Sequence, residues 1–150
     1  MIVDPRNRAF AAGAQSESPV ERVDIFASLC DLADVAAPAD IDGTSLRPML
    51  LDASNRVKSV ATSQFPRWYE GRQLIGNACR NERFCYIEWE DSNFEKEDRR
   101  GEIIDIELYD YHRDPDETRN LANDPEYAEV LMDMQAKALR YKRAHRPAWQ

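Results

Sequence analysis

"RFCYIEWE", residues 83–90, is the segment that decides the fold of this chain. Its side chains alternate between the two faces of an extended strand, with Cys85, Ile87 and Trp89 on one face and Phe84, Tyr86 and Glu88 on the other. Partial alternation recurs in three more short runs: VKSVATSQF at 57–65, QLIGNACR at 73–80 and IELYD at 106–110. We therefore predict four strands in an antiparallel meander.

A long helix is predicted after the last strand. Asp124 suits the cap and Pro125 the first helical position, and acidic residues precede basic ones in the order that complements the helix dipole. One stripe of the helix is apolar at three-to-four spacing: Tyr127, Leu131, Met134, Ala138 and Tyr141. A sheet packed on such a helix makes the fold class α+β.

The N-terminal third predicts a second, shorter helix, at about residues 20–33. Ser18 and Glu21 form a capping box around Pro19, and Asp24 is a second possible cap. An apolar stripe is expected to be buried: Ile25, Phe26, Leu29, Leu32 and Ala33. The next segment, 36–52, carries two prolines and a turn-forming Asp-Gly pair, which is typical of a connector. We place a boundary near Asp52, so that 1–52 and 53–150 are separate parts.

Composition excludes several classes of partner. The 150 residues carry 28 Asp and Glu against 20 Lys and Arg, which argues against nucleic acid because phosphate contacts need clustered cations. No run approaches the roughly 18 apolar residues of a membrane helix, and the start of the chain lacks the pattern of an export signal. We expect a soluble chain. Three scattered cysteines indicate free thiols rather than a disulfide framework.

The acidic segment ELYDYHRDPDETRNLANDPEY, residues 107–127, invites a metal interpretation. Numbered as an EF-hand loop from Asp114, however, it has Arg119 where glycine is required and Pro125 where glutamate is required. The histidines, His112 and His145, have no ligand partner at helical spacing. We therefore predict an Asx-type turn and a helix cap here, and no metal ligand.

The sequence contains no Gly-x-Ser-x-Gly elbow for nucleophilic catalysis. It also contains no phosphate-binding glycine loop. One local anomaly is an excess of arginine between residues 65 and 83, interleaved with Trp68 and Tyr69. Arginine forks beside aromatic rings suit a planar anionic group or a sugar ring. The alternative is a set of surface arginines paired with the charged segment DSNFEKEDRRG, residues 91–101, which we expect to be an exposed loop.

Five segments in register carry a family likeness: VERVDIFASLCDLADV, DGTSLRPML, ATSQFPRW, RNERFCYIEWE and the acidic segment 107–127. Over residues 1–142 the chain resembles the C-terminal part of a sulfatase of the formylglycine-dependent type I family, closest to the iduronate-2-sulfatase-like branch. The resemblance implies a C-terminal subdomain preceded by a remnant of an alkaline-phosphatase-like α/β catalytic domain.

The resemblance also implies an activity and its missing parts. Such sulfatases hydrolyse sulfate esters with a formylglycine, made from a Cys/Ser-x-Pro/Ala-x-Arg motif, beside a calcium ion. Cys79 has Arg83 four places on but Asn81 where proline or alanine is required, and Cys30 and Cys85 lack the arginine. No residue here inherits a catalytic or metal-binding role, so we expect the chain alone to be inactive and to bind neither cofactor.

What the resemblance assigns to this chain is a wall of the substrate pocket. The candidate substrate-binding residues are Gln64, Arg67, Asn77 and Arg80. The family pattern Gly-Tyr-Ser-Ile-Arg-Thr reads Gly-Asn-Ala-Cys-Arg-Asn at 76–81, so the tyrosine associated with iduronate-type specificity is absent. Asp34 stands where a helix-ending glycine is usual, at a small expected cost in stability.

The implied partners are a sulfated saccharide or another sulfate ester, together with a missing catalytic domain or chain. Family members are commonly exported or lysosomal. Two other functions are compatible with the sequence: a free-standing module that binds glycans or proteins, and the small subunit of a split or processed sulfatase.

Overall fold

The computed structural model describes residues 10, 13–91 and 101–144. The chain divides into two compact units, Met1–Ala61 and Thr62–Gln150. The sequence placed this boundary near Asp52; residues 53–60 group with the first unit, where Lys58 binds Glu21 and Asp24. Most of the loop expected at 91–101, and His145, lie outside the described residues.

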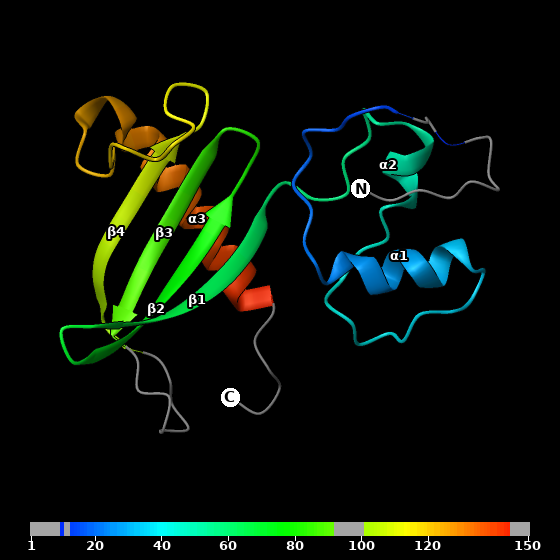
Figure 1. Ribbon diagram of the computed structural model, residues 1–150, viewed down its shortest axis with the longest axis horizontal. Helices are drawn as coiled ribbons and strands as arrows, with labels where there is room; N and C mark the ends of the chain where they lie inside the picture. Colours follow the sequence, from blue (N-terminus) through cyan, green and yellow to red (C-terminus); the bar gives the residue numbers. More distant parts are fainter. Residues whose placement is uncertain (1–9, 11–12, 92–100, 145–150) are drawn as a thin grey trace. The chain divides into compact units, whose positions relative to one another are not determined.

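The second unit is built on a four-stranded sheet in the order β1-β2-β3-β4 (Figure 1). The strands are β1 (Ala61–Tyr69), β2 (Arg72–Arg80), β3 (Phe84–Asp91) and β4 (Ile103–Asp110). The β2–β3 and β3–β4 pairs are antiparallel, and β1 joins β2 through Glu70 and Gly71, both with positive φ, as a tight two-residue hairpin requires. The predicted meander is confirmed.

One face of the sheet packs on the C-terminal helix α3 (Ala128–Ala144), and we call it the covered face (Figure 1). Cys79, Tyr86 and Leu108 lie in register across β2, β3 and β4, and all three are buried. Met134 and Ala138 of α3 are buried as well. These residues form the core, because alternation sends every second strand residue toward the helix.

The start of the helix follows the prediction. The backbone N–H of Glu126 donates to Asp124 Oδ1 (3.1 Å), so Asp124 caps the 3-10 turn Pro125–Tyr127 that leads into α3. Tyr127 is buried and packs edge-on against Phe84, with ring centroids 6.4 Å apart. Leu131 and Tyr141, the other members of the predicted stripe, are half-buried. The period of 3.6 residues therefore identified the packed side of the helix correctly.

The first unit contains α1 (Asp24–Leu32) and α2 (Arg47–Leu51). The predicted capping box is wrong: α1 starts after Val23 with no side-chain cap, and the Ser18 hydroxyl is buried without a hydrogen-bond partner in the described structure. The carboxylate of Asp24 instead accepts the backbone N–H groups of Glu21 (2.7 Å) and Thr44 (2.9 Å) and the ammonium of Lys58 (2.7 Å). Those bonds hold residues 21–23 outside the helix.

The apolar stripe on α1, a packing surface by its helical period, is exposed within this unit, as expected for a chain that lacks the catalytic domain. Asp24, Ala27 and Ser28 face inward, whereas Ile25, Phe26 and Leu29 are exposed. The Ser28 hydroxyl donates to the Asp24 carbonyl (2.6 Å) and accepts the N–H of Leu46 (2.9 Å). The connector 43–46 thus hydrogen-bonds to the polar side of the helix and leaves its apolar side outward.

The end of α1 matches the expectation for Asp34. Its φ of 54° is left-handed, and the next N–H, of Val35, donates to the Cys30 carbonyl (2.9 Å). This bonding closes the last helical turn, a position where glycine is usual because it lacks a Cβ.

Candidate functional site

The four residues selected from the sequence lie on both faces of the sheet. The Gln64 amide donates to Asn77 Oδ1 (2.8 Å). Asn77 is in register with Glu88, which binds Lys142 of α3, so this amide pair belongs to the covered face. Arg67 and Arg80 lie on the opposite face, which we call the distal face, because their aromatic contacts are to side chains there. The four residues therefore do not form one cluster.

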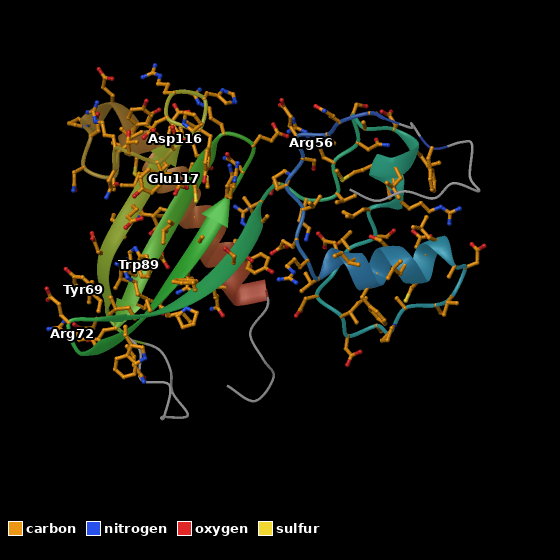
Figure 2. The ribbon with its side chains drawn as sticks, viewed as in Figure 1. Arg56, Tyr69, Arg72, Trp89, Asp116 and Glu117 are labelled. Atoms are coloured by element: carbon orange, nitrogen blue, oxygen red, sulfur yellow. The ribbon has the colours of Figure 1, made fainter. Side chains whose placement is uncertain are left out.

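Arg67 is held by two aromatic rings. Its guanidinium carbon lies 5.5 Å from the centroid of Tyr69 and 5.7 Å from the centroid of Trp89, within the range of cation–π attraction. We call these three residues the aromatic cradle. Figure 2 shows Tyr69 and Trp89 toward the end of the sheet that carries the β1–β2 turn. The rings restrict the arginine without using its N–H donors.

Trp89 is itself held by Gly76 and Glu107. A Cβ at Gly76 would approach the Trp89 ring to 2.9 Å, so the ring occupies the space over the glycine. Trp89 Nε1–H donates to Glu107 Oε1 (2.9 Å), and the Tyr109 hydroxyl donates to Glu107 Oε2 (3.0 Å). Burial, with the Glu107 carboxylate as a second cause, raises the pKa of Tyr109 to about 12, which keeps that hydroxyl a donor.

Arg80 has a similar support at the other end of the distal face. Its guanidinium carbon lies 3.9 Å from the ring centroid of Tyr111. The Tyr111 hydroxyl donates to Glu117, which stands near Asp116 at that end in Figure 2. Burial, and then the Glu117 carboxylate, raises the pKa of Tyr111. Stacking at 3.9 Å again orients a guanidinium by its flat side.

The arginines of this region fall into two groups, those with a carboxylate partner and those without one in the described structure. Arg72 lies 3.8 Å from Asp91, and Arg83 donates to both oxygens of the buried Asp110 at 2.9 and 2.6 Å. Neither Arg67 nor Arg80 has a carboxylate within ion-pair distance among the residues described by the structure. Pairing with acidic groups therefore accounts for Arg72 and Arg83, while Arg67 and Arg80 keep their donors available.

The acidic segment forms a turn, as predicted. Asp114 accepts the backbone N–H of Arg119 (2.9 Å) and the Thr118 hydroxyl (3.1 Å). Within residues 10, 13–91 and 101–144, no group of three or more His, Cys, Asp or Glu side chains could hold a metal ion. None of the helices in this described part is long and apolar enough to cross a membrane.

The cysteines are free thiols, as expected. Cys79 and Cys85 are buried in the sheet, and Cys30 is half-buried on α1. Burial raises the pKa of Cys85 to about 11, so the nucleophilic thiolate is scarce at neutral pH. This environment is that of a structural thiol.

The sequence reasoning missed the supports of the two arginines. Trp89 was assigned only to a strand face, and Tyr69 only to an arginine-rich segment. The signal that could have found the cradle is the two-residue turn Glu70–Gly71, since such a turn fixes the register of β1 against β2. That register brings Tyr69 and Arg67 to the face that carries Trp89.

A comparison with protein families matches residues 2–144 to the model described as N-sulphoglucosamine sulphohydrolase, C-terminal. The chain belongs to this family. Delta 4,5-hexuronate-2-O-sulfatase of Bacteroides thetaiotaomicron is 32% identical over 129 residues, which are 81% of this chain and 24% of that protein. Arylsulfatase K of Xenopus laevis is 28% identical over 137 residues, which are 91% of this chain and 24% of that protein.

A solved structure of a 2-O GAG sulfatase is 32% identical and superimposes with a TM-score of 0.62, covering 81% of this chain and 24% of that one. The predicted identity as the C-terminal part of a sulfatase is confirmed, and so is the α+β fold of its C-terminal subdomain. The chain spans about a quarter of the length of these sulfatases.

Proposed function

We propose that the chain is the C-terminal part of a sulfuric ester hydrolase that acts on a sulfated saccharide, and that its distal face forms a wall of the substrate pocket. The observation that carries the proposal is the family match over residues 2–144, joined to 32% identity with a hexuronate-2-O-sulfatase. A saccharide ring with a sulfate group needs planar cationic donors and apolar ring contacts, and the aromatic cradle offers both.

In this proposal the catalytic centre lies outside the 150 residues. None of the three cysteines sits in the Cys/Ser-x-Pro/Ala-x-Arg motif, and the described residues offer no donor set for calcium. We therefore assign the formylglycine and the calcium ion to the rest of the sulfatase. The residues of this chain bind and orient, through Arg67 and Arg80, the saccharide that the rest of the protein hydrolyses.

We propose a class of sugar for the substrate and no individual compound. The relative acts, by its name, on a Δ4,5-hexuronate 2-O-sulfate, and a related uronate is our first candidate. Iduronate-type specificity has weaker support, because Asn77 replaces the family tyrosine and its side chain is engaged with Gln64 on the covered face. Gln64 and Asn77 remain proposed substrate contacts. They would meet a saccharide at the edge of the sheet, where Gln64 is exposed.

The proposal is tested by reading the DNA upstream of the codon for Met1. We expect the frame to continue into a Cys/Ser-x-Pro/Ala-x-Arg motif. An in-frame stop codon with no such motif would contradict a continuous sulfatase. It would favour the small subunit of a split sulfatase if the chain copurifies with a separate catalytic chain, and a glycan- or protein-binding module if it does not.

A further inference from the structure

We propose that Arg67 and Arg80 form a two-point track on the distal face that grips two anionic groups on different sugars of a sulfated oligosaccharide. This inference rests on the proposed function, because it names the ligand of the same face. It goes beyond that function in assigning the chain its own affinity for sugars that do not react. The two points are the aromatic cradle around Arg67 and the Arg80–Tyr111 stack.

The first point is a guanidinium that is oriented and yet unsatisfied. Two rings restrict Arg67, and no carboxylate in the described structure takes its donors. Fixing a long side chain before binding lowers the entropic cost of contacting a ligand. Sulfate esters and carboxylates accept two parallel N–H bonds from such a fork. Arg67 is therefore prepared for an anion rather than engaged in holding the fold.

Exposed aromatic rings beside the Arg67 site suit a sugar. Tyr69 is 50% exposed, and Phe65 is 65% exposed. Alternation along β1 directs Phe65, like Arg67 and Tyr69, to the distal face, since Gln64 points to the covered one. Rings of this kind offer an apolar surface to the C–H side of a sugar, while the guanidinium takes its charged substituent.

The second point lies farther along the sheet. Trp89, the base of the cradle, stands opposite Gly76, and Arg80 is four residues beyond Gly76 on the same face of β2. At about 3.3 Å per residue, the backbone positions of Gly76 and Arg80 are roughly 13 Å apart, so the two anion sites lie on separate parts of the sheet. One sulfate group cannot reach both sites, so the ligand must carry anionic groups on more than one sugar.

Two acidic residues of the distal face, Glu107 and Glu117, already accept hydrogen bonds from aromatic side chains. Glu107 accepts from Trp89 and Tyr109, and Glu117 accepts from Tyr111, so both carboxylates are committed to the aromatic supports. The chain also carries a formal net charge of −8, which opposes indiscriminate capture of polyanions. Binding must therefore come from the two placed arginines rather than from a general positive field.

Isothermal titration of the 150-residue chain tests the track. The ligands are a 2-O-sulfated unsaturated uronate tetrasaccharide, the corresponding disaccharide, the desulfated and carboxyl-reduced tetrasaccharide and inorganic sulfate. We expect the sulfated tetrasaccharide to bind about tenfold or more tightly than the other three, because it alone reaches both sites. No binding of the tetrasaccharide, or equal binding of the desulfated one, would overturn the proposal.

Matched variants locate the binding. We expect Arg67→Ala and Arg80→Ala each to weaken tetrasaccharide binding about tenfold, and Arg72→Ala, an exposed arginine paired with Asp91, to change it less than twofold. Arg67→Lys keeps the charge but loses the fork, and should bind weakly while folding normally. Equal losses in all three alanine variants, or no loss in any, would reject the track.

Different results would reject the two proposals. An in-frame stop codon rejects the continuous sulfatase without touching the titration. Sulfate release by the polypeptide of the whole reading frame that is weakened by Arg67→Ala, with the tetrasaccharide bound no more tightly than the disaccharide, rejects the track and leaves the proposed function in place.

Discussion

Gly76 lies directly opposite Trp89 in the β2–β3 ladder, and the Trp89 ring occupies the space that a side chain at Gly76 would need. Gly76 is not among the residues of the described chain that have a positive φ. The position therefore requires glycine for space rather than for backbone conformation. Through Trp89 it also supports Arg67. A residue with no side chain is therefore part of the proposed binding face.

Gly76→Ala should destabilise the second unit by about 1–3 kcal/mol and displace the Trp89 ring, because the new Cβ would meet the ring at 2.9 Å. Urea unfolding followed by tryptophan fluorescence measures the change. Gly71→Ala is the control for a glycine with free space but positive φ. The double variant Gly76→Ala/Trp89→Leu should recover part of the loss; a fully additive double variant would show that the contact is not the cause.

Asp110→Asn should lower the free energy of unfolding by about 1–2 kcal/mol at pH 7, by weakening two charged hydrogen bonds to Arg83. The loss stays small because the Arg83 side chain is 40% exposed, and solvent screens its attraction to Asp110. Urea midpoints of the two proteins give the difference, and Asp105→Asn, on an exposed residue of the same strand, is the control.

The stability difference between wild type and Asp110→Asn should depend on pH. The Arg83 hydrogen bonds lower the pKa of Asp110 in the folded protein. Its contribution is therefore fully present above the unfolded value of about 3.9 and is lost as the pH falls through the folded value. The stability difference between wild type and Asp110→Asn should be constant from pH 5 to 7 and shrink below about pH 4. A difference that grows on acidification would contradict this account.

Thiol labelling should distinguish the three cysteines. With its pKa raised to about 11, Cys85 is protonated at pH 8, and Cys79 is 1% exposed. We expect a maleimide to modify Cys30 first in the native chain and all three residues equally in urea, as read by peptide mass spectrometry. Native labelling of Cys85 at the rate of Cys30 would show that the sheet opens readily.

The outward apolar side of α1 should make the isolated chain bind hydrophobic dyes and self-associate. Phe26 is 53% exposed, and Ile25 and Leu29 lie beside it on the helix. Phe26→Asp should lower dye fluorescence and the mass found by light scattering. Val35→Asp, which changes an exposed apolar residue beyond the helix, should leave both unchanged. A monomeric wild type that binds no dye would refute the prediction.

The second unit was predictable because its signals are local. Trp89 and Tyr86 alternate across one strand, and Asp124 caps a helix whose apolar residues repeat every three or four positions. Both patterns point to one partner, the other layer of the same unit. The sequence alone therefore contained the sheet, the helix and the faces that meet.

The first unit departed from its prediction because the deciding contacts are distant in sequence. Asp24 binds Thr44 and Lys58, and Ser28 binds Leu46, which turns the polar side of α1 inward. The local cap signal of Ser18 and Glu21 could not reveal these bonds. The apolar stripe was predicted to be a packing surface, and nothing in the described unit covers it.

The candidate residues were chosen without knowledge of their geometry, and their role in binding stays a prediction. The family likeness led to all four candidates, and the excess of arginine beside aromatic residues included Arg67 and Arg80. These two have stacking partners and no carboxylate in the described structure. Gln64 and Asn77 were added by family likeness, and they lie on the other face. A shift of one residue along a strand reverses the face, so residue type alone could not separate the two pairs.

Sulfate release from a 2-O-sulfated unsaturated uronate disaccharide is the most direct test of the central claim, that this chain binds substrate for a catalytic centre located elsewhere in a sulfatase. We predict release by the polypeptide encoded by the whole reading frame, none by residues 1–150 alone, and a KM raised about tenfold by Arg67→Ala with kcat little changed. Sulfate release by residues 1–150 that a single substitution within them abolishes would contradict the claim.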